Sequence, residues 1–474
     1  MYTLSMNQLG VIGLGTMGAA LARNAARNGA EVSVYNRTQG ITDEFMKEYG
    51  QEGEIKAFKS YKDLVQSLAH PRAILIMVKA GYPVDKVIND VREFLEPGDI
   101  IIDGGNSLYS DSERRFEELE KKGLRFIGLG VSGGEEGALN GPSMMAGGDS
   151  DSYKELEDLL ASMAADDGEG GKCVSFLGEG GAGHFVKMVH NGIEYGVMQI
   201  IAECYDVLKR IGGFTNEQLS ETFAAWRDSD ELNSYLLEIT ADIFTKKDPE
   251  GSEDLIDVIK DSAGQKGTGK WTTQAAHDFG VAIPTINAAV DARIISGSEE
   301  ERESGNDFPV SVDEQDPIPP PKKLNSILRN AYELSVILTY LQGLSLIKKA
   351  NEEKEWGIDA SEVARIWQGG CIIRSVLLKS LQNSLSSDNE VASAAKEELI
   401  NRFSGEPQKD WRRIVTYASS RGIPIPAISA SLSYWDSLRS DRLPQNLIQA
   451  QRDFFGAHGF ERVDKEGEGF HGGW

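Results

Sequence analysis

The chain has 474 residues, too many for one ordinary hydrophobic core and enough for two or three domains. Its composition, 40% hydrophobic and 26% charged, is ordinary for a globular protein. The net charge of −25, with no long run of basic residues, argues against nucleic acid or an anionic membrane as a partner.

Signals for membrane insertion and export are not found in the sequence. No stretch of about 18 apolar residues occurs, so we expect no membrane span. Residues 1–7 lack a basic region followed by an apolar one, so we expect no secretory signal. Cys173, Cys204 and Cys371 are too far apart to form a metal motif or a disulfide framework. These features indicate a cytoplasmic protein with reduced thiols.

The first third of the chain alternates strand and helix signals. Leu9 to Ile12 predict a buried strand, and Met17 to Asn28 predict a helix. Further strands are expected at 31–35, 73–78, 99–103 and 125–128. Strands separated by helices imply a parallel sheet with helices on both faces. We therefore expect an α/β domain over residues 1–180, in which 166–171 form a surface loop.

The remainder of the chain has a different pattern. After Gly183 helical periodicity dominates almost to residue 440, which predicts an all-helical domain over 181–440. Residues 441–474 are polar and end in a glycine-rich sequence that is unsuited to a core of its own. Such a tail either frays or lies on a partner.

A glycine motif follows the first predicted strand and opens the first helix. It fits the pattern G-x-G-x-x-G and consists of Gly13, Leu14, Gly15, Thr16, Met17 and Gly18. In a Rossmann-type fold such glycines allow a tight turn and let the backbone approach a pyrophosphate at the helix N-terminus. A glycine turn with a purely structural role is the alternative. The strand–turn–helix context favours a dinucleotide-binding Rossmann-type domain.

The end of the second strand indicates which dinucleotide is bound. NAD-specific folds usually place an acid there, on the ribose 2′-hydroxyl, whereas this chain has Asn36, Arg37 and Thr38. Arg37 can pair with a 2′-phosphate and Thr38 can donate a hydrogen bond to it. The alternative is a solvated loop arginine. The sequence favours NADP.

A polar stripe runs along the first helix of the helical domain. It consists of Lys187, His190, Asn191, Glu194 and Tyr195, which share one helical face in otherwise apolar sequence. Buried charge is costly unless it is paired or used. The stripe is rich in groups that transfer protons, so we predict an active site. A structural Lys187–Glu194 ion pair is the alternative.

Nine motifs are spread along nearly the whole chain: GLGTMG at 13–18, NRT at 36–38, VKAG at 78–81, DGGNS at 103–107, GVSGGEEGA at 130–138, KMVHNGIEYG at 187–196, KGTGKW at 266–271, GCIIR at 370–374 and NLIQAQRDFFGAH at 446–458. In sequence and in order, these motifs resemble the 6-phosphogluconate dehydrogenase family, within the β-hydroxyacid dehydrogenases.

The resemblance implies a role for each of these motifs. Contacts to NADP are implied for Asn36, Arg37, Thr38, Val78, Lys79, Ala80 and Asn106. Substrate contacts are implied for Asn106, Ser132, Gly133, Gly134, His190, Asn191, Tyr195, Lys266 and Arg293. Lys187 is implied as the general base and Glu194 as the general acid. Arg452 and His458, in the tail, are implied to reach the site of the neighbouring subunit of a homodimer.

The activity implied by the resemblance is oxidative decarboxylation of 6-phosphogluconate to ribulose 5-phosphate, with NADP as cofactor and no metal. Another β-hydroxyacid dehydrogenase, or a non-catalytic protein that senses NADPH, remains an alternative. The sequence departs from the family at Gly15, Ala20 and Val197, where the family commonly has Ala, Asn and Asp. None of these three departures removes a residue with an implied catalytic role.

Overall fold

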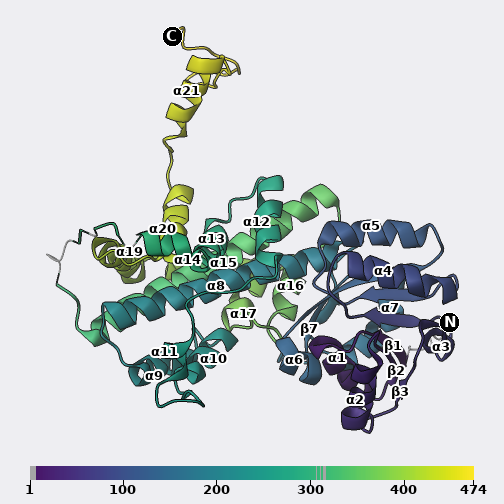
Figure 1. The fold of residues 1–474 in the computed structure, drawn as a ribbon. Coiled ribbons are helices and arrows are strands. Elements are labelled where there is room, and N and C mark those ends of the chain that lie inside the picture. The colour runs from purple at the N-terminus through teal and green to yellow at the C-terminus, as the bar shows by residue number, and fades with distance from the viewer. Residues whose placement is uncertain (1–6, 306, 310, 313–316) are drawn as a thin grey trace.

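The computed structural model describes residues 7–305, 307–309, 311–312 and 317–474. Residues 1–6, on which most of the expectation about a secretory signal depends, lie outside this part of the chain. The described chain forms an α/β part, a helical part and a projecting carboxy-terminal tail (Figure 1). Among its helices, none is long and apolar enough to cross a membrane.

An eight-stranded sheet forms the centre of the α/β part, in the order β3-β2-β1-β4-β5-β6-β7-β8. The strands are β1 (Gln8–Ile12), β2 (Glu31–Tyr35), β3 (Ile55–Ala57), β4 (Ala73–Ile76), β5 (Ile100–Asp103), β6 (Arg125–Ser132), β7 (Ser143–Gly148) and β8 (Val174–Phe176). Every neighbouring pair is parallel except β6 and β7, which are antiparallel. The predicted strands correspond to β1, β2, β4, β5 and β6, and the predicted α/β fold is confirmed.

Helices cover both faces of this sheet. They are α1 (Thr16–Arg27), α2 (Gln39–Tyr49), α3 (Tyr61–Gln66), α4 (Tyr82–Val91), a 3-10 turn (Arg92–Phe94), α5 (Tyr109–Glu120), α6 (Gly134–Asn140) and α7 (Ser150–Met163). One hydrophobic cluster joins α1, α2 and α7 to the sheet. A second cluster joins α3, α4 and α5 to the opposite face. The expected two-sided arrangement is therefore present.

The helical part is arranged around two long helices, α8 and α15, which pack along each other (Figure 1). Its helices are α8 (Ala182–Arg210), α9 (Asn216–Arg227), α10 (Tyr235–Ile243), α11 (Leu255–Val258), α12 (Thr268–Asp278), α13 (Pro284–Gly297), α14 (Glu299–Gly305), α15 (Pro321–Lys354), α16 (Ala360–Ile366), α17 (Leu377–Ser384), α18 (Asn389–Arg402), α19 (Gly405–Ser420) and α20 (Pro426–Leu438). One large core of buried side chains joins most of them.

The first turns of α8 lie directly against β6 and β7, and glycines make this contact possible. A Cβ on Gly183 would lie 2.6 Å from the carbonyl oxygens of Gly128 and Met145. A Cβ on Gly130 would collide with the Lys187 side chain. Small residues on both elements therefore let α8 approach the sheet closely, and this approach places Lys187 beside β6.

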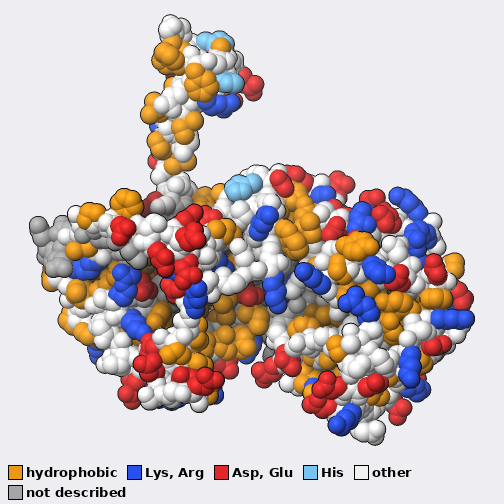
Figure 2. Space-filling view, viewed as in Figure 1, with side chains coloured by type: hydrophobic (Ala, Val, Ile, Leu, Met, Phe, Trp, Pro, Cys, Tyr) orange, Lys and Arg blue, Asp and Glu red, His pale blue; other side chains and the backbone are white. Residues whose placement is uncertain are grey.

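The tail stands away from the rest of the chain (Figures 1 and 2). It contains α21 (Gln445–Gly456), and residues 457–474 fold back along it. The buried carboxylate of Asp453 organises this fold, since it accepts hydrogen bonds from the backbone of Gly459 and Gly472 and from the His471 and Trp474 rings. Phe454 and Phe455, in contrast, are 69% and 73% exposed.

Candidate active site

The predicted cofactor residues gather at the carboxyl ends of β1, β2, β4 and β5. β1 lies between β2 and β4, so the strand order reverses at β1. β2 and β3 lie on one side of it, and β4 and the later strands lie on the other. In open α/β sheets, ligands bind in the crevice at this point. The glycine turn that follows β1 is therefore in the position that a dinucleotide site requires.

Each glycine of the turn has a distinct environment. Gly13 has φ +100° and lies against the Met77 backbone, while Gly18 lies against the Gly13 carbonyl. Nothing lies within 4 Å of a Cβ placed on Gly15. Gly13 and Gly18 are thus needed for the turn itself, whereas Gly15 borders the open space before α1. That space also explains why the family can carry alanine at this position.

The end of β2 is connected to the glycine turn by Asn36. Its side-chain oxygen accepts from the Leu14 amide at 3.1 Å, and its amide nitrogen donates to the Thr38 carbonyl at 3.1 Å. Arg37 and Thr38 are exposed beside this connection. Within the described chain, the Arg37 guanidinium forms no hydrogen bond or ion pair, so it is available to an anionic ligand.

The two remaining cofactor segments follow β4 and β5. Val78 and Ala80 are half-buried, while Lys79 and Asn106 are exposed. A residue that the sequence reasoning missed, Arg115 of α5, holds both segments together. Its guanidinium donates to the Gly81 carbonyl at 3.1 Å and to the Asp103 carboxylate at 3.0 Å. Arg115 is 2% exposed, yet in the sequence it resembles any surface arginine of a polar helix.

The polar stripe of α8 is brought together as predicted and is largely buried. Lys187, His190, Asn191 and Tyr195 are between 0% and 8% exposed, and the Glu194 side chain is 23% exposed. His190 Nδ1 lies 3.1 Å from the Asn191 side-chain oxygen and 3.5 Å from Lys187 Nζ. Lys187 and His190 continue the contact of α8 with β6, whereas Tyr195 packs against α12 and α13 within the helical part.

Burial changes the acid–base properties of this stripe. Desolvation lowers the pKa of Lys187 from 10.5 to about 8, although the nearby Glu194 carboxylate opposes this shift. Desolvation also raises the pKa of Glu194, against the charges of Lys187 and Arg293. The pKa of His190 lies well below its usual range because the ring is buried beside Lys187. Among the described residues, Lys187 and Glu194 form no direct ion pair, although each charge shifts the pKa of the other group.

The loop at 132–134 approaches the stripe from the sheet. Ser132 Oγ lies 3.0 Å from His190 Nε2 and accepts a hydrogen bond from the Ile372 amide at 3.4 Å. Gly133, with φ +121°, leaves no room for a side chain beside the Gly370 carbonyl. Gly134 is exposed at the start of α6. Ser132 therefore lies against His190, and Gly133 and Gly134 follow it directly at the start of α6.

Tyr195 and Arg293, two of the residues with an implied substrate contact, meet at the far end of the stripe. The Arg293 guanidinium lies 3.4 Å from the centre of the Tyr195 ring and donates to the Gly264 carbonyl. Gly269 of α12 packs so closely on the Tyr195 ring that a Cβ would lie 2.6 Å from it. Lys266 is exposed in the loop that leads into α12. The loop with Lys266 is thus held beside Tyr195 and Arg293.

Arg452 and His458 are not brought to the site of their own chain. Arg452, on α21, donates to Gln449 within the tail, and the His458 ring packs edge-on against Phe455. Figure 1 shows α21 far from α8. Of the departures from the family, Val197 lies in the main hydrophobic core and so is not part of the polar stripe.

A glycine turn at the carboxyl ends of parallel strands in an α/β part, together with a buried lysine on a helical part, is the architecture of a nicotinamide-dependent dehydrogenase. The sequence also matches two family profiles. Residues 8–178 match the NAD binding domain of 6-phosphogluconate dehydrogenase, and residues 183–474 match the 6-phosphogluconate dehydrogenase C-terminal domain. The chain therefore belongs to the 6-phosphogluconate dehydrogenase family.

Individual relatives agree with this assignment. The chain is 49% identical to the decarboxylating 6-phosphogluconate dehydrogenase of Synechococcus elongatus, over 99% of this chain and 100% of the relative. It is 46% identical to a chloroplastic enzyme of the same name from Arabidopsis thaliana, over 100% and 98%. The Plasmodium falciparum 6-phosphogluconate dehydrogenase, solved with its cofactor NADP+ and with its substrate, superposes with a TM-score of 0.89 at 41% identity, covering 98% of this chain and 100% of that one.

Replacing Lys187 with methionine tests the state of this buried lysine. Its folded pKa of about 8 lies below its unfolded value near 10.5, so between these pH values the unfolded chain binds more protons and stability rises with pH. Below pH 8 the buried charge costs roughly 3 kcal/mol. We expect Lys187→Met to abolish turnover and to raise the melting temperature at pH 7, by an amount that shrinks towards pH 10. Calorimetry that shows a lower melting temperature at pH 7 would mean that the ammonium has a stabilising partner.

Proposed function

We propose that the protein catalyses the NADP-dependent oxidative decarboxylation of 6-phosphogluconate to ribulose 5-phosphate, carbon dioxide and NADPH. The single observation that carries this proposal is the buried Lys187, whose pKa is lowered to about 8 within a chain that belongs to this family over nearly its full length. A lysine in this state can act as a base near neutral pH, which ordinary surface lysines cannot.

The cofactor site fits NADP. The open space at Gly15 and the uncapped N-terminus of α1 suit a pyrophosphate. Arg37, which has no partner among the residues that the structure describes, suits a 2′-phosphate. We propose that Asn36, Arg37 and Thr38 hold the 2′-phosphate. The segments with Val78, Lys79 and Ala80, and with Asn106, then line the rest of the cofactor. When bound, NADP accepts the hydride from carbon 3 of the substrate.

Lys187 has two tasks in the proposed reaction. As the neutral amine it takes the proton of the carbon 3 hydroxyl while that carbon is oxidised. The resulting ketone is β to the carboxylate, so carbon dioxide can leave with the bonding electrons passing to the ketone oxygen. Lys187, now an ammonium, stabilises the negative charge on that oxygen in a site from which water is largely excluded. His190, kept neutral by burial, adds no competing positive charge.

Glu194 is proposed as the acid that completes the reaction by protonating carbon 1 of the enediol. Its raised pKa supports this role, because a carboxyl that keeps its proton nearer neutral pH is a better donor. We propose that Ser132, the amides of Gly133 and Gly134, His190 and Asn191 bind the sugar acid. The phosphate would lie against Tyr195, Lys266 and Arg293, where a guanidinium is already held in place.

An assay of NADPH production tests this function directly. We expect rapid turnover with 6-phosphogluconate and none above background with 3-hydroxyisobutyrate, which lacks the phosphate that Lys266 and Arg293 would bind. Preference for 3-hydroxyisobutyrate would favour the alternative β-hydroxyacid dehydrogenase. Binding of NADPH without turnover of either compound would favour a sensor.

Cofactor choice should depend on Arg37. In Arg37→Asp a charge-assisted pair with the 2′-phosphate is replaced by repulsion, while NAD has no such group. We expect the KM for NADP to rise by about 100-fold or more and the KM for NAD to change by less than about threefold. Arg27→Gln, which removes an arginine on the first helix away from the β2 end, serves as the control. Equal losses for both cofactors would contradict the proposed contact.

We further propose a cytoplasmic homodimer in which the tail of each chain completes the site of the other. The described cysteines are free and buried, as suits a reducing compartment. The projecting tail exposes Leu447, Phe454 and Phe455, and apolar side chains cluster along it in Figure 2. Such a surface is stabilised by burial on a partner.

The domain division at 1–180, 181–440 and 441–474 is also part of this proposal. Its first boundary is the short link between β8 and α8.

Subunit mixing tests the proposed role of the tail. Arg452→Ala and Lys187→Met should each be inactive as homodimers, because one loses a substrate contact and the other loses the base. After exchange, a heterodimer holds one site with both native residues, so we expect about a quarter of wild-type activity from a one-to-one mixture. Mass spectrometry would verify the exchange. No recovery in verified heterodimers would mean that the tail serves its own chain.

A further inference from the structure

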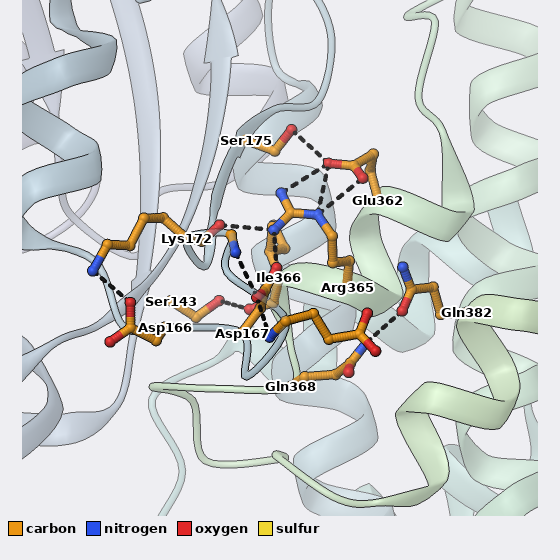
Figure 3. A network of polar contacts seen from close by, with 12 residues as sticks. Ser143, Asp166, Asp167, Lys172, Ser175, Glu362, Arg365, Ile366, Gln368 and Gln382 are labelled. Carbon is orange, nitrogen blue, oxygen red and sulfur yellow. Dashed lines mark hydrogen bonds and ion pairs between the residues drawn. The ribbon is translucent and has the colours of Figure 1, made fainter.

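The loop at residues 166–172 lies outside the proposed substrate and cofactor contacts, yet it is bound tightly to the helical part. Arg365, on α16, donates through Nη1 to the Asp167 carboxylate and to the Lys172 carbonyl, each at 2.9 Å (Figure 3). Its Nε and Nη2 donate to the Glu362 carboxylate, also at 2.9 Å. We call this group of four residues the Arg365 clamp.

The loop side of the clamp is itself rigid. The Asp167 side chain is only 5% exposed and also accepts hydrogen bonds from the backbone amides of Glu169 and Gly171, each at 2.9 Å. Burial alone would raise the pKa of Asp167, but these amides and Arg365 together hold it below its usual value. A partly buried, bidentate network of this kind holds its geometry better than an exposed ion pair.

The segment that follows the clamp leads directly to the proposed substrate site. Ser143 of β7 donates its hydroxyl to the Ile366 carbonyl at 2.6 Å (Figure 3) and its amide to the Gly370 carbonyl at 2.8 Å. Two residues further on, the Ile372 amide donates to Ser132 Oγ at 3.4 Å. Residues 366–372 therefore form a continuous connection between Arg365 and Ser132.

The same segment also contacts the catalytic helix. The Trp367 ring is fully buried and lies edge-on to the His190 ring, with 5.7 Å between the ring centres. Ser132 and His190 are hydrogen-bonded to each other. A shift of residues 366–372 would therefore reach both members of this pair, one through the Ile372 amide and the other through the Trp367 ring.

We propose that the Arg365 clamp is a positioning device for substrate binding, which fixes residues 366–372 across the domain boundary and so sets the places of Ser132 and His190. Arg365 touches neither of these residues and acts only through the segment that follows it. The proposal rests on the substrate-binding roles proposed for Ser132 and His190. It does not involve the proposed cofactor residues, which follow β1, β2, β4 and β5, whereas the clamp lies beside β7 and β8.

Kinetics of Arg365→Gln and Asp167→Asn, each as the full-length protein, test this proposal. We expect the KM for 6-phosphogluconate to rise at least about fivefold in both variants, while the affinity for NADP, measured by fluorescence titration, changes less than about twofold. Because both variants break the same contact, the double variant should be no worse than the more impaired single one. Arg365→Lys keeps the charge but not the planar fork and should recover only part of the loss.

Arg402→Gln is the matched control. Arg402 also pairs with two carboxylates, those of Glu333 and Glu398, and its side chain is 20% exposed, as is that of Arg365. We expect Arg402→Gln to lose about as much thermal stability as Arg365→Gln. The KM for 6-phosphogluconate should not change in this control. The same pattern in Arg365→Gln and Asp167→Asn would overturn the positioning role. Inactivity of the wild-type protein on 6-phosphogluconate would instead overturn the proposed function.

Discussion

The close contact of α8 with β6 and β7 determines where the buried polar stripe lies relative to the sheet. Gly128, Gly130 and Gly183 let the helix approach to a distance that larger residues would prevent. The same approach removes Lys187 from water, and this desolvation lowers its pKa to about 8. The buried lysine lowers the stability of the folded protein, but its lowered pKa lets it act as a base in the proposed reaction.

In the proposed reaction the two parts of the chain contribute different halves of the active site. The sheet presents the nucleotide crevice at the ends of its parallel strands, together with Ser132. The helical part presents Lys187, Glu194 and the Tyr195–Arg293 pair. Because the proposed reaction removes a hydride from carbon 3 and a proton from the hydroxyl on that carbon, the two halves have to be held in one orientation. Buried networks such as that of Arg115, and the segment after Arg365, hold loops of both halves in place.

Much of this arrangement was predictable from local sequence. The glycine turn, the strands β1, β2, β4, β5 and β6, and the stripe from Lys187 to Tyr195 all have periodic or spaced patterns within about a dozen residues. Arg115, Asp453 and Arg365 were not predictable in this way, since each resembles a surface charge in its own helix. Arg365 contacts Asp167, which is 198 positions away, and only the folded chain brings the two together. The strands β3 and β8 have three residues each, too few for a pattern, and β7 is rich in glycine and methionine.

The state of Lys187 in the folded protein is the most direct test of this account. Lysine labelled with carbon-13 at Cε allows each amine to be titrated by NMR, and the Lys187→Met spectrum identifies the Lys187 signal. We expect a midpoint near pH 8, and a lower midpoint in Glu194→Gln, because the carboxylate that raises the Lys187 pKa is then absent. A midpoint near 10.5 in the wild-type protein, unchanged in Glu194→Gln, would contradict the claim that burial prepares Lys187 to act as a base.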